Sequence, residues 1–181
     1  FNFTNDFKDQ SRKKLNINKN DIVLIFLGRL SFHAKAHPYP MYKALNNLQD
    51  SIDDDQKIHL IQAGWFPNDY IKDVFVSDAK NLCPEVVCHF IDAREPVNKS
   101  MALAASDIFI SLSDNFQETY GLTPLEAMAS GLPVVISDWN GYKDTVRDGV
   151  DGFSIPTITL EPGDGQDMAY RYFSQITSYD L

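Results

Sequence analysis

The chain has 181 residues, which is the size of one ordinary domain. It carries 16 Lys and Arg against 25 Asp and Glu, a formal net charge of −9. Nucleic acid and anionic membrane surfaces are therefore not expected partners, because both favour basic patches. A hydrophobic content of 44% argues against disorder, and two cysteines are too few for a disulfide scaffold. No apolar run reaches the roughly 18–20 residues of a membrane span.

Strand-like and helix-like patterns alternate along the chain. Residues 1–20 are predicted to form a linker and a short helix, and residues 21–181 a single domain. Strands are predicted at residues 22–27, 57–63, 86–91, 107–112, 133–137 and 152–155. Helices are predicted at residues 40–48, 67–82, 96–105, 122–130, 142–147 and 168–176. Because the chain starts at Phe1 and stops in a helical pattern, we expect it to be a domain of a longer protein.

This order of elements predicts an α/β fold: a doubly wound, Rossmann-like parallel sheet of about six strands with helices on both faces. In such sheets ligands bind beyond the carboxyl ends of the strands. The loops that follow the strands are therefore the candidate site. The fingerprints GxGxxG and GxxxxGK[ST] are both absent, which excludes a generic nicotinamide-dependent oxidoreductase.

The loop after the first predicted strand begins at Gly28 and holds two cations, Arg29 and Lys35. A planar guanidinium and a point-like ammonium at the end of a buried strand suit a diphosphate. The alternative is that both are solvated loop cations that pair with surface carboxylates. His33 and His37 flank Lys35 and are expected to be ordinary solvated loop residues; the alternative is that one of them contacts phosphate or the acceptor.

The loop after the fourth predicted strand leads into the helix at residues 122–130. Gly121 permits close backbone approach at its start, and the amino end of that helix predicts an anion site. Glu118, before the helix, is predicted either to accept hydrogen bonds from sugar hydroxyls or to be solvated. Glu126 is either a ligand-binding carboxylate or the partner of Thr123 in a helix capping box.

Six short segments occur in a distinctive order. They are Gly28-Arg29-Leu30 with Lys35, the E-x7-E pair Glu118 and Glu126, Tyr120-Gly121-Leu122, Glu126-Ala127-Met128-Ala129, Gly131-x-Pro133-Val134-Val135 and Asp148-Gly149-x-x-Gly152-Phe153. Together they resemble the carboxyl-terminal, donor-binding half of a retaining glycosyltransferase with the GT-B architecture (group 1, family 4). The resemblance covers roughly residues 1–157.

The resemblance implies that the domain binds a nucleotide-diphospho-sugar, with a UDP- or GDP-sugar expected. Arg29 and Lys35 would contact the diphosphate, and Glu118 the transferred sugar; these three would be the catalytic residues. Glu126 would hydrogen-bond the ribose. The rest of the implied donor-binding set is Gly28, Thr119, Tyr120, Gly121 and Leu122, with the base near Ile91 and Asp92.

No cofactor is implied, and the acceptor, a saccharide or a lipid, would bind a missing amino-terminal domain. Two cations and a helix amino terminus can stabilise the charge of a leaving diphosphate without a metal ion. Asp53-Asp54-Asp55 is interpreted as a solvated run at the end of a helix rather than a metal-binding D-x-D cluster, so no metal is expected. We expect a cytoplasmic protein, free or peripheral to a membrane. The alternatives are a sugar-nucleotide epimerase or a phosphorylase of the same fold, or a non-catalytic binding domain.

Two further groups are expected to be structural. His59 and His89 lie in predicted strands and are expected to be packing or edge residues. Cys83-x4-Cys88-His89 is a poor zinc pattern without additional ligands.

Overall fold

The computed structural model describes residues 3–114, 120–158, 163, 165–166 and 169–170. The strands are β1 (Ile22–Leu27), β2 (Ile58–Gly64), β3 (Val87–Asp92), β4 (Ile108–Ser111), β5 (Val134–Ser137) and β6 (Gly152–Ile155). The helices are α1 (Asn5–Lys14), α2 (Tyr39–Gln49), α3 (Asp69–Leu82), α4 (Pro96–Ala105) and α5 (Leu122–Ala129), with the short 3-10 helix η1 (Asn140–Tyr142). In the described part of the chain no helix has the length and apolarity needed to cross a membrane.

All six strands form one parallel sheet in the order β3-β2-β1-β4-β5-β6, which confirms the predicted α/β fold. The chain runs outward from β1 to β3, then crosses back to lay β4 on the other side of β1. β1 and β4 are thus neighbours in the sheet although their crossovers turn to opposite sides. This is the topological switch point at which doubly wound sheets bind ligands.

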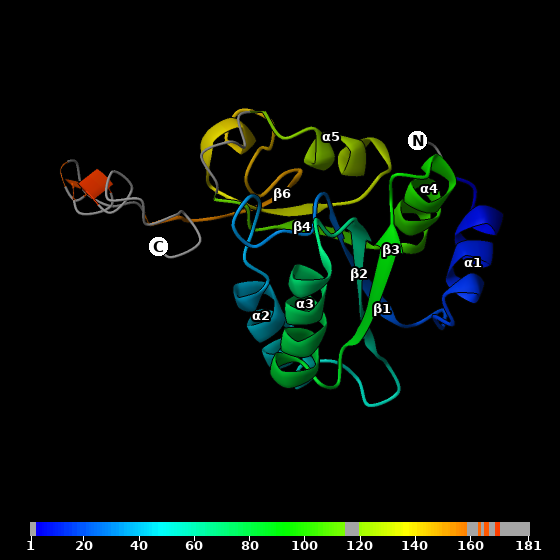
Figure 1. Ribbon diagram of the computed structural model, residues 1–181. Coiled ribbons are helices and arrows are strands. Elements are labelled where there is room, and N and C mark those ends of the chain that lie inside the picture. The colour runs from blue at the N-terminus through cyan, green and yellow to red at the C-terminus, as the bar shows by residue number, and fades with distance from the viewer. Residues whose placement is uncertain (1–2, 115–119, 159–162, 164, 167–168, 171–181) are drawn as a thin grey trace.

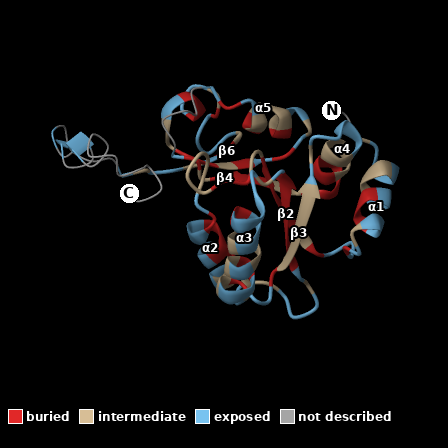
Figure 2. Cartoon of the chain, viewed as in Figure 1, coloured by how far each residue is buried: buried red, intermediate tan, exposed pale blue. Residues whose placement is uncertain are grey.

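The sheet is buried on both faces, and β1 shows why its sequence is a continuous apolar run. Val23, Ile25 and Leu27 belong to one core cluster, and the alternate residues Leu24 and Phe26 belong to the other. The first cluster packs under α4 and α5 and the second under α2 and α3, on opposite sides of the sheet (Figure 1). Figure 2 shows the resulting arrangement, with buried strands at the centre and exposed outer helix faces.

The short helix predicted within residues 1–20 is α1, and it packs against α4. Arg12 fastens it to the domain. Its guanidinium is buried and donates to Asp107 Oδ2 at 2.5 Å and to the carbonyl oxygen of Ala105 at 3.0 Å. It also donates to the carbonyls of Asn18 and Asp21, so the turn between α1 and β1 closes around this one charge.

The helix predicted at residues 142–147 is wrong. The 3-10 helix η1 ends at Tyr142, the first residue of this segment, and turns follow it. The physical reason is that the backbone N–H of Arg147 is bonded to the Asp151 carboxylate, at 3.1 Å, and so serves the turn that leads into β6 rather than a helix. The helix predicted at residues 168–176 lies almost entirely outside the described residues.

Candidate functional site

A cavity of about 260 Å³ opens at the carboxyl ends of β1 and β4, at the switch point of the sheet. Its lining comes from the ends of both strands, the loop after β1, the start of α5 and η1. The lining residues are Phe26, Leu27, Gly28, Lys35, Ser111, Tyr120, Gly121, Leu122, Thr123 and Tyr142.

The amino end of α5 forms one wall of this cavity. Gly121 is the residue before the helix and has φ +78°, a left-handed conformation that favours glycine. An added Cβ would also lie 2.3 Å from Cε1 of Tyr142, whose ring is fully buried against Gly121. The Tyr142 hydroxyl is 3.0 Å from Ser111 Oγ, at the end of β4. Tyr142 and Ser111 therefore fix the position at which α5 begins.

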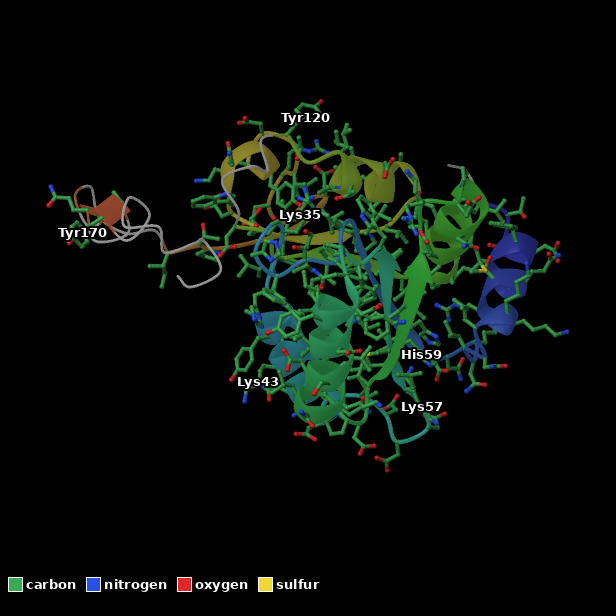
Figure 3. The ribbon with its side chains drawn as sticks, viewed as in Figure 1. Lys35, Lys43, Lys57, His59, Tyr120 and Tyr170 are labelled. Atoms are coloured by element: carbon green, nitrogen blue, oxygen red, sulfur yellow. The ribbon has the colours of Figure 1, made fainter. Side chains whose placement is uncertain are left out.

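Lys35 forms another part of the cavity wall. Its loop is joined to the loop after β4, because Ser113 Oγ donates to the Lys35 carbonyl oxygen at 3.3 Å. Ser137, at the end of β5, in turn donates to the Ser113 carbonyl. These two hydrogen bonds join the carboxyl ends of β1, β4 and β5, which are neighbours in the sheet. Figure 3 shows Lys35 within this region and Tyr120 on its outer surface, where 58% of that side chain is exposed.

A cation at the amino end of a helix makes this cavity suited to an anion. The first backbone N–H groups of an α-helix have no partner within the helix, and they carry partial positive charge. Thr123 and Leu122, which line the cavity, are the first two residues of α5. The structure thus brings Gly28, Lys35 and Gly121 together at one cavity.

Glu126 does not line this cavity and is not part of a capping box. The helix begins at Leu122 with Gly121 as its cap, so Thr123 lies inside the first turn and cannot be the cap residue. Glu126 instead forms an ion pair with Lys99 of α4, Oε1 to Nζ at 2.5 Å, with both side chains partly exposed. Sequence reasoning missed Lys99, because it lies 27 residues away and no local pattern links the two.

A second hollow, also about 260 Å³, lies beside the first at the carboxyl ends of β2 and β3. It contains Ile91 and Asp92, the predicted base-binding residues, together with Leu30, Gly64, Trp65, Phe66, Lys72, Phe90 and Arg94. The two hollows meet where Gly64 passes Gly28. A Cβ on Gly64 would lie 1.7 Å from the Gly28 carbonyl oxygen, so only glycine allows the two strand ends to approach this closely.

Asp92 in this second hollow is held by a local ion pair. The Arg94 guanidinium donates to both Asp92 oxygens, at 2.9 Å and 2.5 Å, and lowers the pKa of Asp92 to about 2. The carboxylate is therefore charged at neutral pH, and a ligand here would meet the pair rather than an isolated anion.

The remaining predicted site residues are placed less completely. Arg29 follows Gly28 and is half-buried, but it is not among the residues that line either hollow. Glu118 and Thr119 lie outside the described residues. Neither histidine beside Lys35 is simply solvated: Ser31 Oγ is 3.4 Å from the His33 ring, and His37 Nδ1 accepts from the Tyr39 N–H at 3.2 Å. The described residues hold no cluster of three or more His, Cys, Asp or Glu that could bind a metal ion.

Comparison with known proteins agrees with this geometry. Residues 7–160 match the family model described as glycosyl transferases group 1. The chain belongs to this family. Its six-stranded parallel sheet with flanking helices is the α/β fold of the GT-B glycosyltransferases.

Curated proteins with glycosyltransferase or synthase names are similar to this chain in sequence. The D-inositol 3-phosphate glycosyltransferase of Corynebacterium kroppenstedtii is 28% identical over 81% of this chain and 32% of its own length. The alpha-monoglucosyldiacylglycerol synthase of Streptococcus pneumoniae is 32% identical over 68% of this chain and 26% of its own length. The chain thus spans about a third of the length of the curated relatives that it matches.

Solved structures share the fold. A structure of Anabaena HepE in complex with UDP and glucose superposes with a TM-score of 0.64 at 21% identity, over 98% of this chain and 46% of that chain. The carboxyl-terminal domain of a group 1 glycosyl transferase (LpcC) from Francisella tularensis superposes with a TM-score of 0.57 at 19% identity, over 97% of this chain and 84% of that chain.

Proposed function

We propose that this chain is the donor-binding domain of a retaining glycosyltransferase, and that it binds a nucleotide-diphospho-sugar across its two adjoining hollows. The observation that carries the proposal is the first hollow, which Lys35 and the amino end of α5 line together at the switch point of the sheet. The described wall of this hollow offers cationic and N–H groups, which suit a diphosphate.

The same groups account for the chemistry. Glycosyl transfer breaks the bond between the anomeric carbon and the diphosphate, and negative charge develops on the leaving oxygen. The Lys35 ammonium and the α5 N–H groups stabilise that charge electrostatically, and they do so without a metal ion. Arg29 contributes from the same loop. Glu118 contacts hydroxyls of the transferred sugar.

The second hollow takes the nucleoside. Its position beside the first, across the Gly28–Gly64 contact, suits a ligand whose diphosphate and base lie along one line. The base then lies against Ile91 and Asp92, and the ribose hydroxyls reach Glu126. UDP is the favoured nucleotide, since HepE, which shares the fold, is described in complex with UDP and with UDP-glucose.

The acceptor binds outside this domain. The chain spans a third of its curated relatives, so a further part of the whole protein supplies the acceptor site. The relatives' names, a D-inositol 3-phosphate glycosyltransferase and an alpha-monoglucosyldiacylglycerol synthase, support a polar polyol or a lipid headgroup as the acceptor class. A lipid acceptor would bring the whole protein to a membrane surface from the cytoplasm. This chain alone would transfer little sugar.

Calorimetric titration with UDP, GDP, ADP and NAD, each with and without Mg²⁺, tests the proposal. We expect saturable binding of one nucleoside diphosphate, indifferent to Mg²⁺, and no binding of NAD. Lys35→Gln is expected to raise the Kd at least about tenfold, because a hydrogen bond to a charged group contributes about 1.5–3 kcal/mol. Lys43→Gln, on the exposed face of α2 away from the hollows, is the matched control (Figure 3). Binding that tolerates Lys35→Gln as well as Lys43→Gln would refute this site.

A further inference from the structure

The two cysteines of the chain share a cavity on the opposite side of β3 from α4. Cys83 ends α3, and Cys88 is the second residue of β3, the edge strand of the sheet. A tight turn connects them, closed by the Val86 N–H bonded to the Cys83 carbonyl at 3.1 Å. Both thiols are free and both line one cavity of about 320 Å³. The proposed sugar-transfer chemistry uses neither of them.

The surroundings of the two thiols differ. Cys83 is buried and its Sγ donates to the Ala79 carbonyl at 3.2 Å, whereas Cys88 is only half-buried. The rest of the cavity wall is apolar except for Lys80, one helical turn before Cys83. The cavity exceeds the roughly 30 Å³ that a water molecule occupies in the liquid, so a molecule the size of hydrogen peroxide has room beside both sulfurs.

We propose that Cys83 and Cys88 form a redox-active dithiol that a small hydroperoxide oxidises to an intramolecular disulfide. The Cys83 thiolate attacks one peroxide oxygen, the O–O bond breaks, and the departing oxygen takes a proton and leaves as water or alcohol. Cys83 is then a sulfenic acid. The Cys88 sulfur attacks Cys83 Sγ, the S–O bond breaks, and water leaves with the proton of the Cys88 thiol. In sum, two thiols and one hydrogen peroxide give one disulfide and two waters.

The two thiols on this cavity wall differ in how readily they ionise. A hydrogen bond from the Cys88 thiol lowers the pKa of Cys83, and the same bond together with burial raises the pKa of Cys88. Cys83 is therefore the thiol that ionises and attacks, and Cys88 is the resolving thiol.

The test uses the reduced chain at neutral pH with a small excess of hydrogen peroxide. Intact mass should fall by two hydrogens, peptide mapping should show Cys83 joined to Cys88, and a thiol reductant should restore both thiols. The disulfide should form at least tenfold faster in the folded chain than in the same chain unfolded in urea, because in the fold both cysteines line one cavity. Equal or slower oxidation of the folded chain overturns the proposal, as does a disulfide between two chains on a non-reducing gel.

Two variants separate the roles. Cys88→Ser should stop at the sulfenic acid of Cys83, which a dimedone adduct reports. Cys83→Ser leaves Cys88 without its partner and should react with peroxide at least tenfold more slowly. Equal dimedone labelling of the two variants would overturn the assignment. A urea melt of each variant shows whether it is folded, and the wild-type comparison above stands without either variant.

Discussion

Glu126→Ala distinguishes a structural from a ligand-binding role for this carboxylate, and the two roles differ in magnitude. Its ion pair with Lys99 has side chains 27% and 29% exposed, so its contribution to stability is about 0.2–1 kcal/mol. Since Glu126 caps no helix, the roughly 1 kcal/mol of a lost cap does not apply. We therefore expect the free energy of unfolding to fall by less than about 1 kcal/mol. Two ribose hydrogen bonds to a carboxylate, at about 1.5–3 kcal/mol each, would weaken the Kd by at least about a hundredfold.

Urea unfolding and calorimetric titration with the preferred nucleoside diphosphate measure the two quantities. Lys99→Gln is the matched control, because it removes the same ion pair and keeps the Glu126 carboxylate. It should match Glu126→Ala in stability and retain a Kd within about threefold of wild type. The 2′-deoxy nucleotide should bind the wild type more weakly but bind Glu126→Ala no more weakly than the ribonucleotide does. Unchanged affinity in Glu126→Ala would refute the ribose role.

The remaining predictions concern the first hollow and the amino end of the sheet. Gly121→Ala should lower the free energy of unfolding by at least about 1–2 kcal/mol, because alanine is strained in the left-handed conformation and its Cβ would meet the Tyr142 ring. The same substitution should weaken nucleotide binding. Urea melts measure the first effect and calorimetric titration the second. Burial lowers the pKa of His59, and burial together with the charge of His59 lowers the pKa of His89. As the pH falls below about 6.5, the histidines of the unfolded chain therefore take up protons before those of the folded chain do. The free energy of unfolding should therefore fall between pH 7 and 5, by up to about 1.4 kcal/mol per pH unit for each ring, and urea melts across that range should show a shallower slope in His89→Gln.

The sheet is largely readable from the sequence because its central strands, such as β1 and β2, are buried on both faces. The six predicted strands agree with the structure to within one or two residues at each end, and the helix at residues 96–105 has the predicted bounds. A continuous apolar run such as residues 22–27 is typical of a central strand in a parallel sheet, because both faces of such a strand are buried. The helix predicted at residues 142–147 does not form, because the N–H of Arg147 is bonded to the Asp151 carboxylate and not to a helix carbonyl.

The candidate site is readable only in part. Gly28, Lys35 and Gly121 carry local signals, namely a strand end, a loop cation and a helix start, and the parallel order of the sheet brings them together. Tyr142 and Lys99 carry no such signal. Each acts through a partner from another element, Ser111 in the first case and Glu126 in the second, and such pairs depend on the packing of the whole sheet.

The two ends of the sheet have different roles: polar groups at the amino end stabilise the fold, and the loops at the carboxyl end form the candidate site. At the amino end, polar groups form hydrogen bonds that hold the fold together. The Arg12 guanidinium donates to four backbone carbonyls and to the Asp107 carboxylate. Asp21 accepts from the His59 ring at 3.1 Å, and His59 Nδ1 lies 2.9 Å from His89 Nε2. The two histidines were expected to be packing or edge residues. Their rings stack, His89 lies on the edge strand β3, and the hydrogen bonds join both rings to Asp21.

At the carboxyl end, side-chain hydrogen bonds position backbone rather than fill the space between strand ends, and two hollows remain. Ser113 and Ser137 join loop to loop, and Tyr142 holds the start of α5. All strands of a parallel sheet run in the same direction. The turns whose hydrogen bonds stabilise the fold therefore lie at the amino end of the sheet, and the loops that bind a ligand lie at the carboxyl end. Substitutions at the amino end should therefore change stability with little effect on nucleotide affinity, and those around the hollows should change affinity first.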